Sequence, residues 1–286
     1  MADQQQLEDA EYLLAHTGRE VERLSMQHAW IQKSLDGRIV FAPVDLQRPG
    51  LRVLDVGCAD GILLRDLQKQ VHPSAQLVGV DIMPSFFPTP ETSPSESGNN
   101  IRYALQDICK PFTPDLVSAF DLTHVRYVLI GTASVGIPAA VKNLVTSLAP
   151  DGWLQIQELF VADDAPGDTP AMKDFKVVFR TLLEKIGMDV GFAAELAEVF
   201  KEAGLENVEC KKVRYPVGKS AGNEEDSGNS ILPFKLTVPT MVESVESLGA
   251  SLPASVTENL GERFESEMAS VGGFFESYIV WGQKPL

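Results

Sequence analysis

Short apolar runs alternate with amphipathic segments between residues 51 and 158. The runs are brief and rich in β-branched residues, as buried strands are, whereas the segments 60–71 and 135–148 have the apolar spacing of helices. The five predicted strands are 52–56, 75–82, 101–108, 119–125 and 152–159. Strands separated by helices predict βαβ units and a mainly parallel sheet. The segment 84–100 is rich in Pro, Ser and Thr, which predicts a loop.

Upstream of these strands, apolar residues recur at spacings of three and four, which predicts a helix over residues 7–36. Its apolar stripe consists of Val21, Leu24, His28, Ile31 and Leu35. The pair Asp36-Gly37 is a plausible stop, because glycine suits the left-handed position after a helix. Residues 38–46 then read as a short extended linker.

The pattern downstream of the predicted sheet is different. The expected elements are helices at 170–186, 190–203, 232–250 and 253–271, strands at 206–217 and 273–285, and a polar loop at 218–230. If the two strands pair, a helical insert at about residues 228–270 lies between them. We therefore expect an N-terminal helical lid and linker at 1–48 and a main domain at 49–286, with the lid and the insert above the carboxyl edge of the sheet.

Composition limits the class of protein. The 286 residues are 44% hydrophobic, which is enough for a sizeable core, and no apolar run approaches the roughly 20 residues of a membrane span. Lys and Arg number 24 and Asp and Glu number 40, so the formal net charge is 24 − 40 = −16, the wrong sign for a general binder of nucleic acid. The N-terminus resembles neither a signal peptide nor a transit peptide. Three widely spaced cysteines indicate a reducing compartment without a disulfide frame, so we expect a cytoplasmic protein. We also expect a monomer or a homodimer.

Small residues interrupt the apolar pattern directly after the first predicted strand. The turn reads Asp55-x-Gly57-x-Ala59-x-Gly61, which matches neither the dinucleotide pattern GxGxxG nor a P-loop. In an open parallel sheet, ligands bind at the carboxyl ends of the strands. Glycine and alanine there allow a ligand close to the backbone, although an ordinary tight turn has the same composition.

Two further carboxylates stand near the ends of the next two predicted strands. Asp81 suits a ribose diol, since a carboxylate accepts hydrogen bonds from both hydroxyls, and Ile82 follows it. Asp107 suits an adenine amino group, with Ile108 against the ring. In the alternative interpretation each aspartate only caps its own loop, which is a common role for aspartate.

Together these segments resemble the class I S-adenosylmethionine-dependent methyltransferases. The resemblance rests on "VLDVGCADG", "VGVDI", "QDI", "FDLTHVRYVL" and "LAPDGWLQIQE", within residues 51–158. It implies a Rossmann-like α/β fold, a seven-stranded mainly parallel sheet flanked by helices, with S-adenosylmethionine as methyl donor and S-adenosylhomocysteine as product. Ala59 and Asp151 stand where the family often has glycine. Neither change adds much bulk.

A narrower resemblance extends upstream, to fungal secondary-metabolite methyltransferases and to the related regulator LaeA. It rests on an E-x-x-R-x-x-x-Q-H helix, present as Glu20, Arg23, Gln27 and His28, and on an F-D-x-x-H-x-R segment, present as Phe120, Asp121, His124 and Arg126. The resemblance implies methyl transfer to an oxygen or nitrogen atom of a small natural product. It leaves two alternatives, a regulatory protein of the same fold and a cyclase that uses the fold without methyl transfer.

The candidate catalytic residues are two histidines. His124 lies near the end of the fourth predicted strand and either removes a proton from the acceptor or only orients it. His28, on the apolar stripe, is either a site residue or a core residue. Glu158 either binds a polar acceptor group or caps its loop, and Arg23 either reaches the cofactor or stays at the surface.

Tyr12 is expected to cover the sulfonium, if it is not a packing residue. We expect no metal, because no cluster of Asp, Glu or His has ligand spacing. The candidate cofactor-binding residues are Tyr12, Gln27, Asp55, Gly57, Ala59, Gly61, Asp81, Ile82, Asp107, Ile108 and His124.

Overall fold

The structure is a computed structural model that describes residues 20–88, 100–161, 164–165 and 167–286. The chain divides into two compact units. We call Arg38–Glu158, Glu195–Lys211 and Ile279–Leu286 the sheet unit, and Met1–Gly37, Leu159–Ala194 and Lys212–Tyr278 the helical unit. Each unit is described by itself.

The sheet unit contains the alternating strands and helices that the hydrophobic pattern predicts. In chain order they are β1 (Arg52–Val56), α3 (Ile62–Gln68), β2 (Gln76–Asp81), the 3-10 helix η1 (Pro84–Phe86), β3 (Ile101–Leu105), β4 (Phe120–Arg126), the 3-10 helix η2 (Leu129–Thr132), α4 (Ile137–Ser147) and β5 (Leu148–Phe160). The strands β6 (Glu206–Val217) and β7 (Gly273–Gln283) complete the sheet, and β5, β6 and β7 each have residues in both units.

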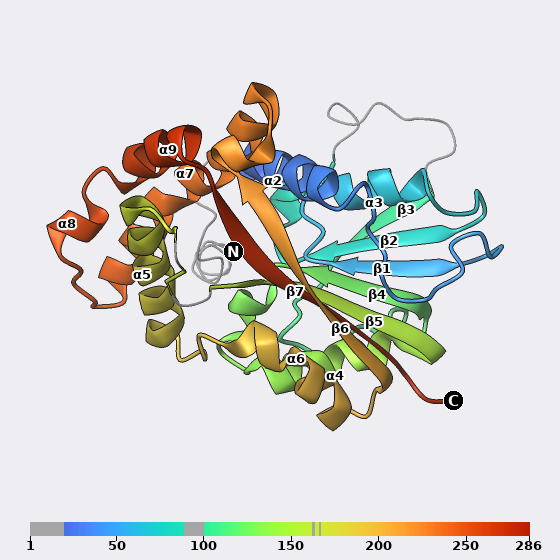
Figure 1. Cartoon of the computed structure of the whole chain (residues 1–286). Coiled ribbons are helices and arrows are strands. Elements are labelled where there is room, and N and C mark those ends of the chain that lie inside the picture. Colours follow the sequence, from blue (N-terminus) through green and yellow to red (C-terminus); the bar gives the residue numbers. More distant parts are fainter. Residues whose placement is uncertain (1–19, 89–99, 162–163, 166) are drawn as a thin grey trace. The chain divides into compact units, whose positions relative to one another are not determined.

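The seven strands have the order β3-β2-β1-β4-β5-β7-β6, and the pairs β1–β2, β2–β3, β1–β4 and β4–β5 are parallel. The expected seven-stranded, mainly parallel sheet is thus confirmed. From β1 the chain moves outward to β2 and β3, and it then returns to the other side of β1 for β4. Because crossovers are right-handed, this reversal places α3 and α4 on opposite faces of the strands (Figure 1). It also creates the switch point between β1 and β4, where ligands bind in such sheets.

The helical unit is built from α2 (Glu20–Ser34), α5 (Pro170–Lys185), the start of α6 (Phe192–Glu202), the 3-10 helix η3 (Gly218–Ala221), α7 (Glu224–Ser247), α8 (Ala254–Thr257) and α9 (Leu260–Ser270). Aromatic rings fill its interior. Phe234 stacks on Phe275 with ring centroids 4.1 Å apart, and Phe175 and Phe264 pack against both rings. The apolar side chains of the predicted insert therefore contribute to a packed core.

Three details of the sequence prediction are wrong. Residues 224–230 begin α7 and are not a loop, because the Asn223 side chain accepts a hydrogen bond from the Asp226 N–H and caps the helix. The strand β3 ends at Leu105, so the "QDI" segment lies in a loop. On α2, Arg23 is buried with 7% of its surface exposed, whereas Leu24 of the predicted stripe is only half-buried.

The turn before the main part of β5 shows why glycine is needed at only one of two positions. Asp151 adopts a left-handed backbone with a φ of 63°, which aspartate tolerates better than most residues. A Cβ on Gly152 would lie 2.7 Å from the Phe120 carbonyl oxygen, so this position has no room for a side chain. The departure at Asp151 from the family's Gly-Gly is therefore compatible with the same turn.

The predicted linker belongs to no helix or strand, and its residues 39–42 are buried. The Gln155 side chain holds it: Oε1 accepts from the N–H groups of Phe41 (2.6 Å) and Ala42 (3.1 Å), and Nε2 donates to the Ile39 carbonyl (2.9 Å). Gln155 is completely buried on β5. One buried carboxamide thus satisfies three backbone groups of a segment that belongs to no helix or strand.

Candidate functional site

The carboxyl ends of β1, β2 and β3 bring the predicted site residues to one edge of the sheet unit. The turn after β1 is tied to β2, because the N–H groups of Gly57 and Cys58 both donate to the Val80 carbonyl. The strand β2 ends at Asp81, and the loop that contains Asp107 follows β3. The predicted order of carboxylates along this edge is therefore present in the fold.

Asp81 links the turns after β1 and β2. Its Oδ2 accepts from the Ala59 N–H and its Oδ1 from the Met83 N–H, both at 2.9 Å. Only 7% of Asp81 is exposed. Burial raises the pKa of this carboxyl above its usual value, the backbone donors partly oppose the shift, and the charge of Asp55 adds to it. The capping role is thus present, and the Ala59 and Met83 donors leave the carboxylate with acceptor capacity for a hydroxyl.

Two glycines of the turn are required by protein neighbours. A Cβ on Gly57 would collide with the Val128 side chain, and one on Gly61 would collide with the Tyr103 hydroxyl. Both glycines also have a left-handed φ. Their lack of side chains is therefore explained by packing and backbone conformation, and their closeness to a cofactor stays a prediction.

Ala59 adopts a left-handed φ of 47°, which is unfavourable for alanine by about 1–2 kcal/mol. We expect Ala59→Gly to raise the free energy of unfolding by about 0.5–1 kcal/mol, since the relief of strain exceeds the extra chain entropy of glycine. Urea denaturation measures this change. The matched control is Ala29→Gly at an exposed site inside α2, which should cost about 1 kcal/mol. A loss of stability in Ala59→Gly would contradict the strain.

Cys58, in the same turn, has a buried side chain. A Cβ on Gly79 would lie 2.7 Å from the Cys58 Sγ, so the glycine in β2 makes room for this thiol. Burial raises the pKa of the Cys58 thiol strongly, and the charges of Asp55 and Asp81 raise it further. The thiol therefore stays neutral and acts as a small apolar packing group.

His124 pairs with Asp55 across the switch point. The two residues are in register on β4 and β1, and His124 Nδ1 lies 2.8 Å from Asp55 Oδ1. Both are buried, and only 1% of His124 is exposed. A carboxylate that accepts from Nδ1 fixes the orientation of the ring. His124 thus has a protein partner, whereas both of its predicted roles toward the acceptor, as a base or as an orienting group, stay hypotheses.

Glu158 shapes the loop after β4. Its Oε1 accepts from the N–H groups of Val128 (2.9 Å) and Leu129 (2.8 Å), so it caps the 3-10 helix η2. Val128 is the residue that covers Gly57. Of the two interpretations of Glu158, loop capping is the one that these hydrogen bonds support.

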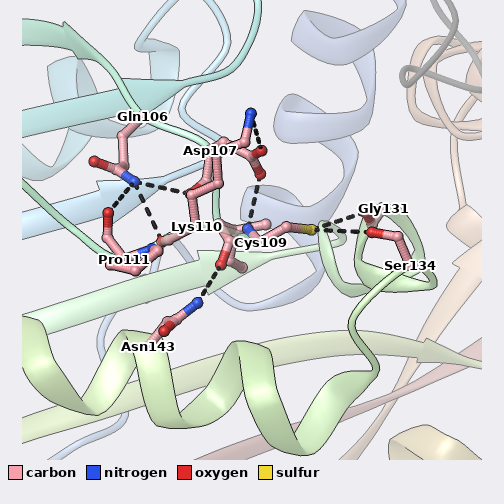
Figure 2. A network of polar contacts seen from close by, with 9 residues as sticks. Gln106, Asp107, Cys109, Lys110, Pro111, Gly131, Ser134 and Asn143 are labelled. Carbon is pink, nitrogen blue, oxygen red and sulfur yellow. Dashed lines mark hydrogen bonds and ion pairs between the residues drawn. The ribbon is translucent and has the colours of Figure 1, made fainter.

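Asp107 lies in a loop with its own network of polar contacts (Figure 2), and Ile108 follows it in the same loop. Asp107 Oδ1 accepts from the Cys109 N–H at 2.8 Å, and Oδ2 lies 3.2 Å from Nζ of the exposed Lys110. Asn143 of α4 donates to the Ile108 carbonyl at 3.2 Å. The carboxylate thus has one oxygen bound to the backbone and one facing a lysine whose exposed position makes the ion pair weak.

The candidates on the N-terminal helix belong to the helical unit. His28 is buried, with 2% of its surface exposed, and Gln27 is half-buried. Of the two alternatives for Arg23, the surface position is wrong, because its guanidinium forms a buried bidentate pair with Glu20; contact with the cofactor stays a prediction. Tyr12 lies outside the described residues. The roles of Gln27 and His28 toward a cofactor stay predictions.

The groups at this edge fit an adenosine moiety. Two hydroxyls need acceptors, which Asp81 offers, and an exocyclic amine needs another, which Asp107 offers. Ile82 and Ile108 follow these two aspartates with apolar side chains suited to a ring.

Two other features are absent from the described residues. None of their helices is long and apolar enough to span a membrane. No three Asp, Glu, His or Cys residues among them form a group that could hold a metal ion.

Known proteins are similar to this chain in sequence. Residues 26–210 match a family profile described as a methyltransferase domain. The N-methyltransferase sirN of Leptosphaeria maculans is 30% identical over 282 residues, which cover 98% of this chain and 96% of that protein. The methyltransferase psoC of Aspergillus fumigatus is 30% identical over 265 residues, which cover 93% of this chain and 94% of that protein.

A solved structure with the same fold is phosphoethanolamine N-methyltransferase 2 of Haemonchus contortus, in complex with phosphomonomethylethanolamine and S-adenosylhomocysteine. The TM-score is 0.51 at 16% identity, and the match covers 92% of this chain and 53% of that chain. At this identity the likeness concerns the fold alone.

Proposed function

The chain belongs to the class I S-adenosylmethionine-dependent methyltransferases, and from this membership we propose that it methylates a nitrogen atom of a small natural product. One observation carries the choice of nitrogen: the relative sirN, which is similar over nearly the whole of both chains, is named an N-methyltransferase. The fold, and the carboxylates at the carboxyl edge of its sheet, are consistent with this reaction.

When bound, S-adenosylmethionine supplies a methyl group that its positively charged sulfur has already activated. We propose that Asp81 accepts hydrogen bonds from the ribose hydroxyls and that Asp107 accepts from the adenine amino group. Ile82 and Ile108 would contact the ring. The turn from Gly57 to Gly61 would lie beside the methionine moiety, as membership of the family implies. The protein's remaining task is to hold the acceptor in line and to exclude water.

The buried pair of His124 and Asp55 supports an acceptor that needs little help from a base. A general base must come within hydrogen-bond reach of the acceptor's proton. His124 is 1% exposed and its Nδ1 lies against Asp55, so only Nε2 could serve, and burial keeps it from solvent. A neutral amine attacks with its own lone pair, whereas a phenol becomes a much better nucleophile once it has lost its proton. We therefore place His124 with the positioning residues.

The proposal is tested with S-adenosylmethionine that carries a deuterated methyl group. Matched acceptors with an amine or a hydroxyl at the same position are incubated with the protein, and mass spectrometry follows S-adenosylhomocysteine and the labelled product. We expect label on the amine, with one S-adenosylhomocysteine for each labelled product.

Other outcomes distinguish the alternatives. Label on the hydroxyl alone would contradict the choice of nitrogen. A converted acceptor without S-adenosylhomocysteine would favour a cyclase. Binding of the cofactor without turnover of any acceptor would favour a regulatory protein of the same fold.

A further inference from the structure

Gln106 is linked to both of the residues that we assign to the ribose and the adenine. It directly follows β3 and precedes Asp107. Its backbone N–H donates to the Asp81 carbonyl at 3.1 Å, which ties the start of the loop to the end of β2. Its surface is 7% exposed. The backbone of Gln106 thus connects the ends of the two strands that carry Asp81 and Asp107.

The side chain of Gln106 holds the loop that follows it (Figure 2). Nε2 lies 2.8 Å from the carbonyl of Asp107, 3.3 Å from that of Pro111 and 3.5 Å from that of Lys110. Oε1 accepts from the Thr113 N–H at 3.3 Å. A single carboxamide therefore closes the loop from Asp107 to Thr113 with both of its polar atoms.

The loop needs such a partner because it belongs to no helix or strand. Pro111 has no N–H to offer, so the carbonyls that converge in this loop depend on donors from outside the turn. A carboxamide combines two N–H donors with an acceptor, which matches the converging carbonyls and the Thr113 N–H. Asn143 of α4 holds the other side of the loop through the Ile108 carbonyl.

We propose that Gln106 is a positioning residue for the adenine end of the cofactor site, because it sets the place of the Asp107 carboxylate relative to Asp81. This inference rests on the proposed function, in which Asp107 receives the adenine amino group. Both polar atoms of the Gln106 side chain are already bonded to the protein, so in this proposal Gln106 acts through Asp107. Its effect should therefore concern recognition of the amino group, while the ribose contact at Asp81 is kept.

Two ligands isolate this effect. S-adenosylhomocysteine carries the amino group, whereas S-inosylhomocysteine carries a carbonyl oxygen in its place, so the group at that position can no longer donate to Asp107. A hydrogen bond to a charged group corresponds to a roughly 10- to 100-fold preference for the adenine ligand. Calorimetric titration of the purified full-length protein gives this ratio of dissociation constants without any turnover.

The variants are Gln106→Ala and Gln106→Glu, with Gln155→Ala as the matched control. Gln106→Glu keeps the length and the acceptor for Thr113 but loses the donors, so it serves if the alanine variant does not fold. Gln155 is also a buried carboxamide with three loop contacts in the sheet unit, but it holds residues 39–42. Circular dichroism and the thermal midpoint report the stability of each variant.

We expect the ratio of the two dissociation constants to fall to about threefold or less in both Gln106 variants. In Gln155→Ala it should stay at the wild-type value, whatever the thermal midpoints of the variants. An unchanged ratio in the Gln106 variants, with a lost ratio in Asp107→Ala, overturns this inference alone. A wild-type ratio near one, or an unchanged ratio in Asp107→Ala, contradicts the proposed adenine contact and overturns the inference with it.

Discussion

Replacing Asp81 by alanine is expected to weaken the binding of S-adenosylhomocysteine about 100-fold. The carboxylate is proposed to accept from two ribose hydroxyls, and a hydrogen bond to a charged group contributes about 1.5–3 kcal/mol. The loss of both, with partial compensation by water, gives roughly 2.7 kcal/mol, or two factors of ten. Isothermal titration calorimetry measures the change directly.

The same carboxylate predicts how binding depends on pH. Burial raises the pKa of Asp81, so the carboxyl takes up its proton at a higher pH than an exposed aspartate does. Only the ionised form offers acceptors to both hydroxyls. Affinity should therefore be full above this raised pKa and should fall as the pH is lowered through it. In Asp81→Asn, which cannot ionise, this part of the pH dependence should disappear.

A separate control is needed because Asp81 also holds the turn after β1 through the Ala59 N–H. The 3′-deoxy form of S-adenosylhomocysteine lacks one of the proposed partners. Wild-type protein should prefer the complete ligand by about tenfold. Asp81→Ala should show almost no preference. If the preference survives in Asp81→Ala, the substitution acts through the turn and the ribose contact is wrong.

The second large effect is expected at His124. In His124→Ala the buried Asp55 carboxylate loses its partner, and breaking a buried pair in this way costs about 3–5 kcal/mol. We therefore expect a loss of stability of this size in urea denaturation. His124→Asn should recover much of it, because the asparagine amide places a donor near the position of Nδ1 and can bond to Asp55.

The asparagine variant also separates the two roles of His124. If His124 positions Asp55, the folded His124→Asn protein should keep its turnover to within about tenfold. If it were the general base, the loss should be on the order of 100- to 10,000-fold at unchanged stability. The rate of S-adenosylhomocysteine formation at saturating ligands distinguishes these results.

The sequence predicted the parts of the molecule that local pattern determines. Strand β1 has the predicted bounds, and β2 and β4 differ from theirs by a residue or two, because short apolar runs between turns identify a buried parallel strand. The positions of Asp81 at the end of β2 and of Asp107 shortly after β3 follow from the same pattern. The topology then brings them to one edge without further information.

Contacts between distant segments were not visible in the pattern. Arg23 and Glu20 have the i, i+3 spacing of an ordinary surface pair, yet both are buried. The pairing of His124 with Asp55 depends on the register of β4 beside β1, which no local signal specifies. The sequence does not predict a role for Gln106, which is only the residue before Asp107. Its one indication is that a polar residue precedes a turn that contains Pro111, whose carbonyls then need a side-chain donor.

The helix that begins at Glu224 was missed for a different reason. Its first turns contain Gly228 and several polar residues, which is the composition of a loop. Three acidic residues after the Asn223 cap stabilise the N-terminus through the helix dipole. Capping and tertiary packing thus overrode a weak intrinsic propensity.

The most direct test of the site is a crystal structure of the full-length protein with S-adenosylhomocysteine bound. The ribose hydroxyls should lie within hydrogen-bond distance of the Asp81 carboxylate, and the adenine amino group within hydrogen-bond distance of Asp107. The ring should contact Ile82 and Ile108. Adenosine bound elsewhere, or bound at this edge with neither carboxylate in contact, would contradict the account.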